Sequence, residues 1–350
     1  MSAFSPKHIL ISRTDKIGDL ILSLPVFQSL RKAFPNARIT ALVSAYAKEV
    51  VQGHPAIDSV EVIDPRDGTG PLIERFKSLN ADVFIALYPR PKLALAAWLA
   101  KIPVRIGTAF RWYGFMFKPK VRMHRHYGDR HEVEFNLHLL KSLGVNEFAT
   151  QIEWPVTAEQ KELAASLLQS RGIAPGTHYV VVHPGHKGSA LNWSIYRYSE
   201  VIARLCHEKD LRVVVTGGLE ETGLIAQLTS LLNFYTFENK PIYLIGECTL
   251  KQLAAVYEGA DCFLSGSTGT MHIAAAVGTP TVALFCPVPE TTPVRWGPWG
   301  NEAIVLMPRN LKCADCQKGN CHKHDPMDDI AEEDVFQAVM KFVHRAKAKT

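Results

Sequence analysis

The sequence predicts an α/β protein with two doubly wound, Rossmann-like domains, each built on a parallel sheet. Apolar runs of strand length alternate with segments of helical spacing along nearly the whole chain. A length of 350 residues is also long for a single hydrophobic core, and the alternation stops at a polar stretch around Trp154 before it starts again. We therefore expect domains over residues 1–150 and 151–330 that face each other across a cleft, followed by a helix over residues 331–350.

The first domain opens with the apolar run HILIS over residues 8–12, which suits a buried parallel strand. A polar loop and a segment of helical spacing over residues 20–34 follow. Further predicted elements are strands over residues 38–44, 59–63 and 82–87 and helices over residues 72–79 and 92–100. The first loop places Asp19 at the carboxyl end of the sheet, where ligands bind in open α/β folds. Asp19 equally fits the N-cap position of the helix after it.

The second domain begins its alternation with the strand YVVV over residues 179–182. This strand runs into the turn HPGHKGSA over residues 183–190, which exposes backbone N–H groups and carries a cation, Lys187. Later predicted elements are a helix over residues 196–208, strands over residues 212–216 and 243–245, and helices over residues 250–258 and 332–346.

The stretch LSGSTGTMHIAAAVGTPTVALFCP over residues 264–287 predicts a strand, a small-residue turn, a helix and a second strand. The helix is expected to begin at Thr268 and to stop at Gly278, with Pro280 beyond it. The first N–H groups of such a helix lack intrahelical partners, and the helix dipole adds positive potential there. A phosphate or diphosphate is therefore the expected ligand. A turn that merely permits close packing is the alternative.

Charge is distributed unevenly along the chain. Residues 1–150 hold 21 Lys and Arg against 13 Asp and Glu, whereas the net charge of the whole chain is only +5. Within residues 90–130 ten basic residues meet one acidic residue, and aromatic side chains are interleaved with them. This basic segment indicates an anionic partner, such as nucleic acid or a phosphorylated lipid or sugar. A solvated basic surface is the alternative. Helical spacing resumes over residues 131–143.

Several protein classes are excluded by their missing motifs. No G-x-G-x-x-G follows the first strand, no G-x-x-x-x-G-K-[ST] occurs, and no G-x-S-x-G elbow is present. The N-terminal residues do not read as a signal peptide, and no stretch is apolar enough to predict a membrane span. We therefore expect a cytoplasmic protein.

The seven cysteines point to a reducing compartment rather than to a disulfide framework. Four of them lie in apolar runs and are expected to be core residues. The others form the pattern Cys313-x2-Cys316-x4-Cys321-His322, whose ligand types and spacing could hold a structural Zn²⁺. Free thiols in a loop are the favoured interpretation, and no metal is expected in the reaction.

Three ordered stretches resemble a known family. They are ILISRTDKIGDLILSLP over residues 9–25, HPGHKGSALNW over residues 183–193, and the stretch over residues 265–287. Together they resemble the heptosyltransferase-type glycosyltransferases of lipopolysaccharide core assembly, which form glycosyltransferase family 9 and have the GT-B architecture. The resemblance extends over nearly the whole chain.

The resemblance implies roles for individual residues. Asp19 matches the catalytic base of the family, which inverts the anomeric carbon by direct displacement. Residues implied in binding the donor are Lys187, Glu220 or its neighbour Glu221, Ser267, Thr268, Gly269 and His272. The helix beginning at Thr268 would stabilise the leaving diphosphate without a metal. The sequence departs from the family at Ser267, where Asp is frequent, and at Leu191, where some members carry Lys or Arg. These departures leave the donor sugar open.

The basic segment lies in what the resemblance makes the acceptor domain. A phosphorylated lipid A and inner-core acceptor would account for its charge. The residues expected to contact this acceptor are Arg105, Arg111, Arg122 and Arg125.

We therefore expect an inverting, cofactor-free transfer of heptose from ADP-heptose to a phosphorylated lipopolysaccharide inner-core acceptor, without nucleic-acid binding. Peripheral association with the cytoplasmic face of the inner membrane stays open. The alternatives are a family-9 transferase that uses another nucleotide sugar, a sugar-nucleotide epimerase or hydrolase, and a non-catalytic binder of anionic glycolipid or nucleic acid.

Overall fold

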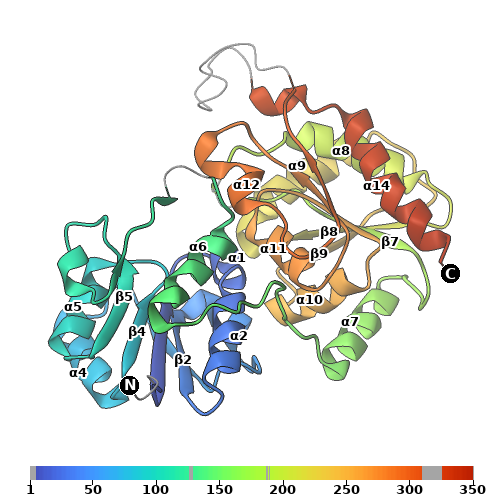
Figure 1. The fold of residues 1–350 in the computed structure, drawn as a ribbon. Coiled ribbons are helices and arrows are strands. Elements are labelled where there is room, and N and C mark those ends of the chain that lie inside the picture. The colour runs from blue at the N-terminus through green and yellow to red at the C-terminus, as the bar shows by residue number, and fades with distance from the viewer. Residues whose placement is uncertain (1–4, 126–128, 187, 189, 310–324, 350) are drawn as a thin grey trace. The chain divides into compact units, whose positions relative to one another are not determined.

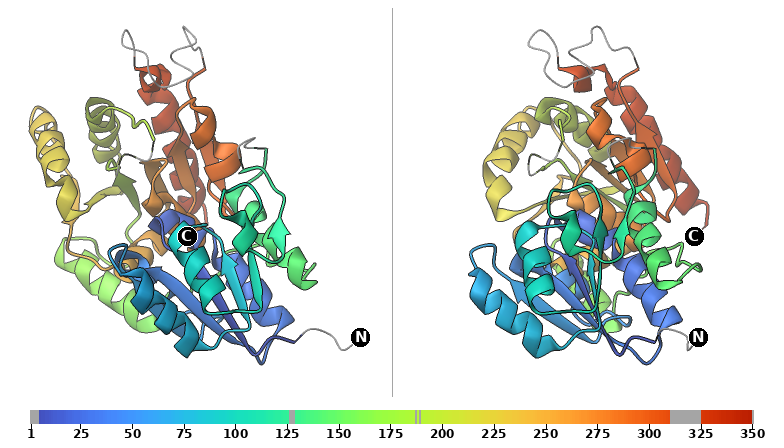
Figure 2. Two further views of the ribbon diagram at one scale, coloured as in Figure 1. Left: turned by 90° about the vertical axis from the view of Figure 1, so that its left-hand side faces the viewer. Right: turned by 60° about the vertical axis from the view of Figure 1, so that its left-hand side comes forward.

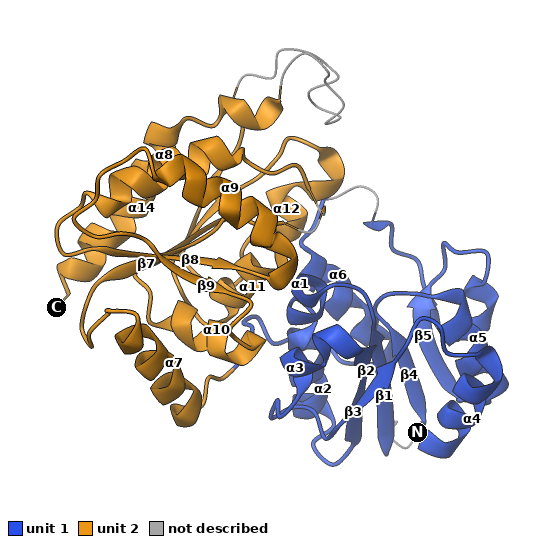
Figure 3. Cartoon of the chain, turned by 180° about the vertical axis from the view of Figure 1, so that it is seen from behind, with its two compact units in different colours: residues 1–154 blue, residues 155–350 orange. Residues whose placement is uncertain are grey.

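The computed structural model describes residues 5–125, 129–186, 188, 190–309 and 325–349. The chain forms two compact units, unit 1 over Met1–Trp154 and unit 2 over Pro155–Thr350 (Figure 3). Each unit has its own sheet and hydrophobic core.

Unit 1 contains a six-stranded sheet in the order β3-β2-β1-β4-β5-β6. The strands are β1 (His8–Arg13), β2 (Arg38–Ser44), β3 (Ser59–Ile63), β4 (Val83–Ala86), β5 (Val104–Thr108) and β6 (Lys120–Val121). All neighbouring strands pair in parallel. Strand β1 is central and all six of its residues are buried, which explains its uninterrupted apolar run.

Helices lie on both faces of this sheet (Figures 1 and 2). The helices are α1 (Ile17–Ile21), α2 (Leu24–Ala33), α3 (Lys48–Val51), α4 (Thr69–Leu79), α5 (Pro91–Leu99) and α6 (Glu132–His138), with 3₁₀ turns η1 (Ala45–Ala47), η2 (Gly114–Met116) and η4 (Leu139–Leu143). Helices α4 and α5 lie on one face, and α1, α2 and α6 lie on the other (Figure 1). Leu72 and Phe76 of α4 and Leu93 of α5 pack with the η2 turn in one buried cluster.

Unit 2 repeats this arrangement, with a second six-stranded sheet in the order β12-β11-β10-β7-β8-β9. The strands are β7 (Tyr179–His183), β8 (Arg212–Gly217), β9 (Ile242–Ile245), β10 (Cys262–Gly266), β11 (Thr281–Leu284) and β12 (Ala303–Leu306). Their neighbours also pair in parallel.

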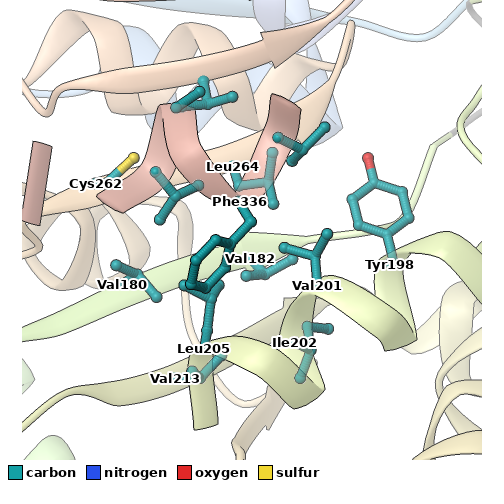
Figure 4. Close-up of a cluster of buried hydrophobic side chains, with 14 of the residues drawn as sticks. Val180, Val182, Tyr198, Val201, Ile202, Leu205, Val213, Cys262, Leu264 and Phe336 are labelled. Atoms are coloured by element: carbon teal, nitrogen blue, oxygen red, sulfur yellow. The ribbon is translucent and has the colours of Figure 1, made fainter. Parts of the chain in front are cut away.

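The helices of unit 2 cover this sheet. They are α7 (Ala158–Ser170), α8 (Ile195–Cys206), α9 (Thr222–Leu232), α10 (Leu250–Glu258), α11 (Gly269–Ala276), α12 (Pro293–Trp296) and α14 (Glu332–Lys347), with 3₁₀ turns η5 (Leu219–Glu221), η6 (Pro289–Thr291) and η7 (Pro326–Asp329). The core joins Val182 of β7, Val201 of α8 and Phe336 of α14 (Figure 4). The C-terminal helix is thus part of the core of unit 2.

Both sheets have the strand order 3-2-1-4-5-6 when numbered within their own unit. The chain reverses its winding direction between β1 and β4 in unit 1 and between β7 and β10 in unit 2. Such topological switch points leave a crevice at the carboxyl ends of the strands, where open α/β sheets bind ligands. The prediction of two doubly wound parallel domains is confirmed.

One predicted helix differs from the structure. The segment over residues 20–34 forms two helices, α1 and α2, and the first begins at Ile17. Pro25 has no N–H to donate, and the hydroxyl of Ser23 donates to the carbonyl oxygen of Asp19 at 2.8 Å. The helix therefore breaks between Leu22 and Leu24.

Three strands were not predicted from the pattern. Strands β5 and β6 lie in the basic segment, where charged residues interrupt the apolar run. Strand β12 is an edge strand whose four residues are all partly or fully exposed, so it lacks the apolar signal of a central strand. Among the described residues, the structure contains no helix with the length and apolar character needed to cross a membrane.

Candidate active site

The switch point of unit 1 is occupied by a buried arginine. Arg13 ends strand β1, and only 2% of its side chain is exposed. Its Nε donates to Asp15 at 2.8 Å, one Nη donates to Asp19, and the other donates to Glu132 at 3.1 Å. The guanidinium therefore holds three carboxylates at the carboxyl end of the central strand.

Asp19 is the third residue of helix α1, so it is not the N-cap of the following helix. The N-cap of α1 is Lys16, and the backbone N–H of Ile17 donates to the Tyr46 hydroxyl at 3.0 Å. The N-cap interpretation of Asp19 is thus wrong, because the helix begins two residues before it. A carboxylate in the first turn is stabilised by the helix dipole.

Helix α6 supplies the other side of this cluster. Glu132 and Asn136 are four residues apart and lie on the same helical face. Asn136 accepts from Arg13 at 3.3 Å and donates to the Ser23 hydroxyl at 3.3 Å, and Ser23 in turn holds the Asp19 carbonyl. Arg125 adds a second cation, which donates to Glu132 at 2.5 Å and to Asn136 at 3.1 Å.

These five charged groups form the charge cluster of unit 1: Arg13, Arg125, Asp15, Asp19 and Glu132. Burial raises the pKa of Asp15 to about 7, with the Arg13 charge opposing this shift and the Asp19 charge reinforcing it. Burial alone would lower the pKa of Arg13, but its carboxylate partners raise it. Arg13 therefore stays charged, whereas Asp15 can hold a proton near neutral pH.

The four arginines predicted to contact an acceptor divide into two pairs. Arg105 is half-buried and donates to the carbonyl oxygens of Ile102 and Met116, so it holds the turn after β5. Arg125 belongs to the charge cluster. Arg111 and Arg122 are exposed. The structure thus brings Arg125 next to Asp19's partners and leaves Arg111 and Arg122 at the surface.

The switch point of unit 2 has the predicted strand, turn and helix, in β10 and α11. Thr268 is the N-cap of α11, and its side chain makes no capping hydrogen bond to the helix. Its hydroxyl lies instead 2.6 Å from that of Thr270. The first backbone N–H groups of α11 lack intrahelical acceptors, which makes this turn suited to an anion. Gly269 opens the helix and His272 is buried within it.

The 3₁₀ turn η5, which follows β8, carries a buried acid near the end of β7. Glu221 accepts from the N–H of Gly218 at 2.8 Å and lies 3.7 Å from Nε2 of His183. His183 ends β7, and its Nδ1 lies 3.0 Å from the Thr216 hydroxyl. A Cβ on Gly185 would lie 2.1 Å from the Glu221 carboxylate, so a larger residue there would displace Glu221 or the turn.

An asparagine ties the turn after β7 to β10. The Asn192 amide donates to the carbonyl oxygen of Pro184 at 2.7 Å, and a Cβ on Gly266 would lie 2.5 Å from its Oδ1. The ends of β7 and β10, which pair at His183 and Ser265, are therefore held in close register.

The remaining predicted residues are placed as follows. Glu220 is exposed, in contrast to the buried Glu221, and Ser267 is half-buried beside the turn. Leu191 packs against the hydrophobic core of unit 2. Lys187 and the cluster of Cys313, Cys316, Cys321 and His322 lie outside the described residues. Within the described residues, no three His, Cys, Asp or Glu side chains are grouped to hold a metal ion.

Sequence reasoning missed the partners of Asp19. Arg13 and Asp15 could have been found, because charged residues directly after a buried strand stand at the ligand-binding edge of a sheet. Glu132 and Asn136 could not, since they lie more than 110 positions from Asp19 and only the fold brings them together.

Comparison with known proteins identifies the family. Residues 70–325 match glycosyltransferase family 9 (heptosyltransferase). Lipopolysaccharide heptosyltransferase 3 of Escherichia coli strain K12 is 26% identical over 340 residues, which cover 93% of this chain and 95% of that protein.

Two solved structures share the fold over almost the full length. The glycosyltransferase family 9 protein from Veillonella parvula has a TM-score of 0.84 at 24% identity, covering 97% of this chain and 98% of that one. The ADP-heptose lipopolysaccharide heptosyltransferase II of Escherichia coli has a TM-score of 0.77 at 19% identity, covering 97% and 99%. The chain therefore belongs to glycosyltransferase family 9, the heptosyltransferases, and is a glycosyltransferase of the GT-B fold.

Proposed function

We propose that this enzyme transfers a heptose from ADP-heptose to a phosphorylated inner-core lipopolysaccharide acceptor, with inversion at the anomeric carbon. The observation that carries the proposal is the Asp19 carboxylate, which a buried arginine holds at the switch point of unit 1. The names of the family-9 relatives, which include an ADP-heptose heptosyltransferase and a lipopolysaccharide heptosyltransferase, support the choice of donor and acceptor.

Unit 2 is assigned the donor. The turn before α11 offers backbone N–H groups and the Thr268 and Thr270 hydroxyls to a diphosphate. Ser267, Gly269 and His272 belong to the same turn and helix, while Lys187 would add a cation from the turn after β7. Glu221 is better placed than Glu220 for the nucleoside ribose, because its carboxylate is fixed next to the switch point.

Asp19 is assigned the catalytic base. It takes the proton from the acceptor hydroxyl as that oxygen attacks the anomeric carbon, while the bond from this carbon to the diphosphate breaks and ADP leaves. The negative charge that develops on the diphosphate is stabilised by the N-terminus of α11. The proposal needs no metal ion or organic cofactor.

Arg13 is assigned a positioning role. Its contacts to Asp15 and Glu132 fix the guanidinium, and the guanidinium fixes the Asp19 carboxylate. Because the Asp19 carboxylate is already held in one orientation, the reaction does not have to supply the free energy of reorienting it. Arg111 and Arg122, which are exposed, are assigned to phosphate groups of the acceptor. The proposal includes a cytoplasmic location at the face of the membrane that carries the acceptor.

The donor assignment is tested by calorimetric titration of the purified chain with ADP, ADP-heptose, UDP-glucose and GDP-mannose, in buffer containing EDTA. We expect ADP and ADP-heptose to bind, and ADP-heptose affinity to fall when Thr268 is replaced by proline, because Thr268 has φ −129° and proline requires about −65°. Selective binding of a UDP- or GDP-sugar would retain the transferase and replace the donor. Binding of no nucleotide would overturn the proposal.

A further inference from the structure

Large apolar side chains gather at the surface of one part of unit 1. Five of the twelve exposed large hydrophobic residues among the described residues lie within residues 98–115. They are Trp98, Leu99, Phe110, Trp112 and Phe115. Single exposed hydrophobic residues are common, but a group of this kind on a soluble protein marks an interaction surface.

The two most prominent members are aromatic and lie in one turn. Trp112 is 78% exposed and Phe115 is 61% exposed. Phe115 meets Trp98 edge to face, with ring centroids 6.2 Å apart. This contact joins the turn between β5 and β6 to the end of α5, so the two segments present one surface.

The turn itself is held firmly by residues that point inward. The Tyr113 hydroxyl donates to the carbonyl oxygen of Pro89 at 2.8 Å, and Nε of Arg105 donates to that of Met116 at 2.7 Å. Phe117 is buried against Gly107, where a Cβ would lie 2.5 Å from its ring. The exposed aromatic rings are thus presented by a well-packed support.

Basic residues accompany these aromatic residues in the sequence, and acidic residues are missing from the same stretch. No Asp or Glu occurs between Asp82 and Asp129. Lys101, Lys118 and Lys120 are exposed in the same part of the chain as the aromatic side chains. This stretch of the chain therefore combines exposed aromatic groups with positive charge and contains no carboxylate between Asp82 and Asp129.

We propose that this aromatic–basic surface docks unit 1 on a lipid bilayer that contains anionic phospholipids. Trp is enriched where membranes meet water, because its ring is amphipathic. Lysine near an anionic leaflet adds electrostatic attraction, which weakens with salt. The charge argues against a second copy of this chain as the occupant, because two such surfaces would repel each other. The proposal deepens the proposed function by naming a docking surface, but its evidence is independent of donor and catalytic residues.

The test is co-sedimentation of the full chain with vesicles of phosphatidylcholine alone and of phosphatidylcholine with phosphatidylglycerol. The vesicles carry no sugar, so acceptor recognition cannot contribute. We expect binding to the anionic vesicles only, with affinity reduced about tenfold in Trp112→Ser/Phe115→Ser and several-fold in Lys101→Gln/Lys120→Gln. Raising the salt concentration should weaken wild-type binding.

Matched controls come from unit 2. Phe234 and Leu219 are exposed hydrophobic residues there, and Lys209 and Lys341 are exposed lysines. The variants Phe234→Ser/Leu219→Ser and Lys209→Gln/Lys341→Gln should bind vesicles like the wild type. All variants should show unchanged circular dichroism and thermal unfolding.

Three outcomes would overturn the proposal. They are failure of the wild type to bind anionic vesicles, equal binding by the aromatic variant, and a dimer in light scattering that the aromatic variant abolishes. Vesicle binding by a chain that binds no ADP would contradict the transferase proposal and leave this one intact. ADP binding by a chain that does not bind anionic vesicles would contradict the docking proposal and leave the transferase proposal intact.

Discussion

The two units have the same strand order but different chemistry at their switch points. In unit 1 the carboxyl end of β1 carries Arg13, which gathers three carboxylates into a buried cluster. In unit 2 the ends of β7 and β10 carry small or neutral groups, among them Gly185, Gly266 and Thr268, together with the buried Glu221.

Under the proposed function, one topology serves two tasks. A reacting carboxylate needs fixed charges around it, and the unit 1 cluster provides them from β1, α1 and α6. A diphosphate needs backbone N–H groups and room for its oxygens, so glycines and threonines suit the unit 2 turn. We infer that unit 1 supplies the chemistry and unit 2 the donor site. Variants at the two switch points should therefore have separable effects.

The largest effect is expected from Asp19→Asn. The amide keeps the shape of the side chain but cannot accept the acceptor proton, so kcat should fall about 10²- to 10⁴-fold. The measurement is ADP release with a lipopolysaccharide core acceptor. Asp64→Asn is the control, because Asp64 is a partly exposed carboxylate of unit 1 that pairs with the exposed Arg66. A kcat of Asp19→Asn within threefold of wild type would remove Asp19 from the reaction.

Glu132→Gln should weaken unit 1 itself. It removes one partner of a buried ion cluster in which both Arg13 and Arg125 bind Glu132, and such losses cost about 3–5 kcal/mol. Urea unfolding measures the change. Because the guanidinium of Arg13 is no longer held, kcat should also fall while KM for the donor stays constant.

Glu61→Gln is the matched control for this variant. Glu61 pairs with Arg75 in unit 1, but both side chains are more exposed than those of the cluster. Its removal should cost about 1 kcal/mol or less. Equal destabilisation by the two variants would show that the charge cluster has no special role.

Gly185→Ala should affect the donor site alone. The new Cβ would lie within 2.1 Å of the Glu221 carboxylate, so either the turn or Glu221 must move. We expect the Kd for ADP to rise about tenfold, by loss of one well-placed contact. Gly223→Ala is the control, since nothing lies within 4 Å of a Cβ at that position. Equal ADP affinity of the two variants would contradict the assignment of this turn.

Asp15→Asn should change the pH dependence of stability. The pKa of Asp15 rises from 3.8 to about 7 on folding, so the folded protein holds a proton that the unfolded chain releases between these values. The contribution of Asp15 to the free energy of unfolding is therefore greatest at low pH and is lost as the pH rises toward 7. Between about pH 5 and pH 7, the unfolding free energy of the wild type should fall by up to about 1.4 kcal/mol per pH unit relative to the variant. Urea unfolding at several pH values checks this, and parallel curves would contradict it.

The sequence was sufficient for the parts of the fold that depend on local pattern. Buried strands such as β1 and β7 appear as continuous apolar runs, and the turn after β10 is recognisable from its small residues and the Gly278–Pro280 helix end. The edge strand β12 and the short β6 were missed, because half-exposed strands carry a weaker apolar signal.

The candidate site could be predicted only in part, because some of its residues are brought together by tertiary packing and not by a local pattern. Asp19 and Thr268 lie in local motifs, so their positions at the sheet edges follow from the chain order. The contacts of Asp19's partner Arg13 with Glu132 and Asn136 depend on how α6 packs, which no local pattern specifies. The pairing of Arg125 with Glu132 is likewise a tertiary result.

The division of labour between the units is tested most directly by titrating ADP into Asp19→Asn and into the wild type under identical conditions. If unit 1 supplies the base and unit 2 the donor site, the Kd for ADP should agree within about twofold although transfer is lost. A Kd for ADP that rises about tenfold or more in Asp19→Asn would contradict this account, because Asp19 would then be part of the nucleotide site.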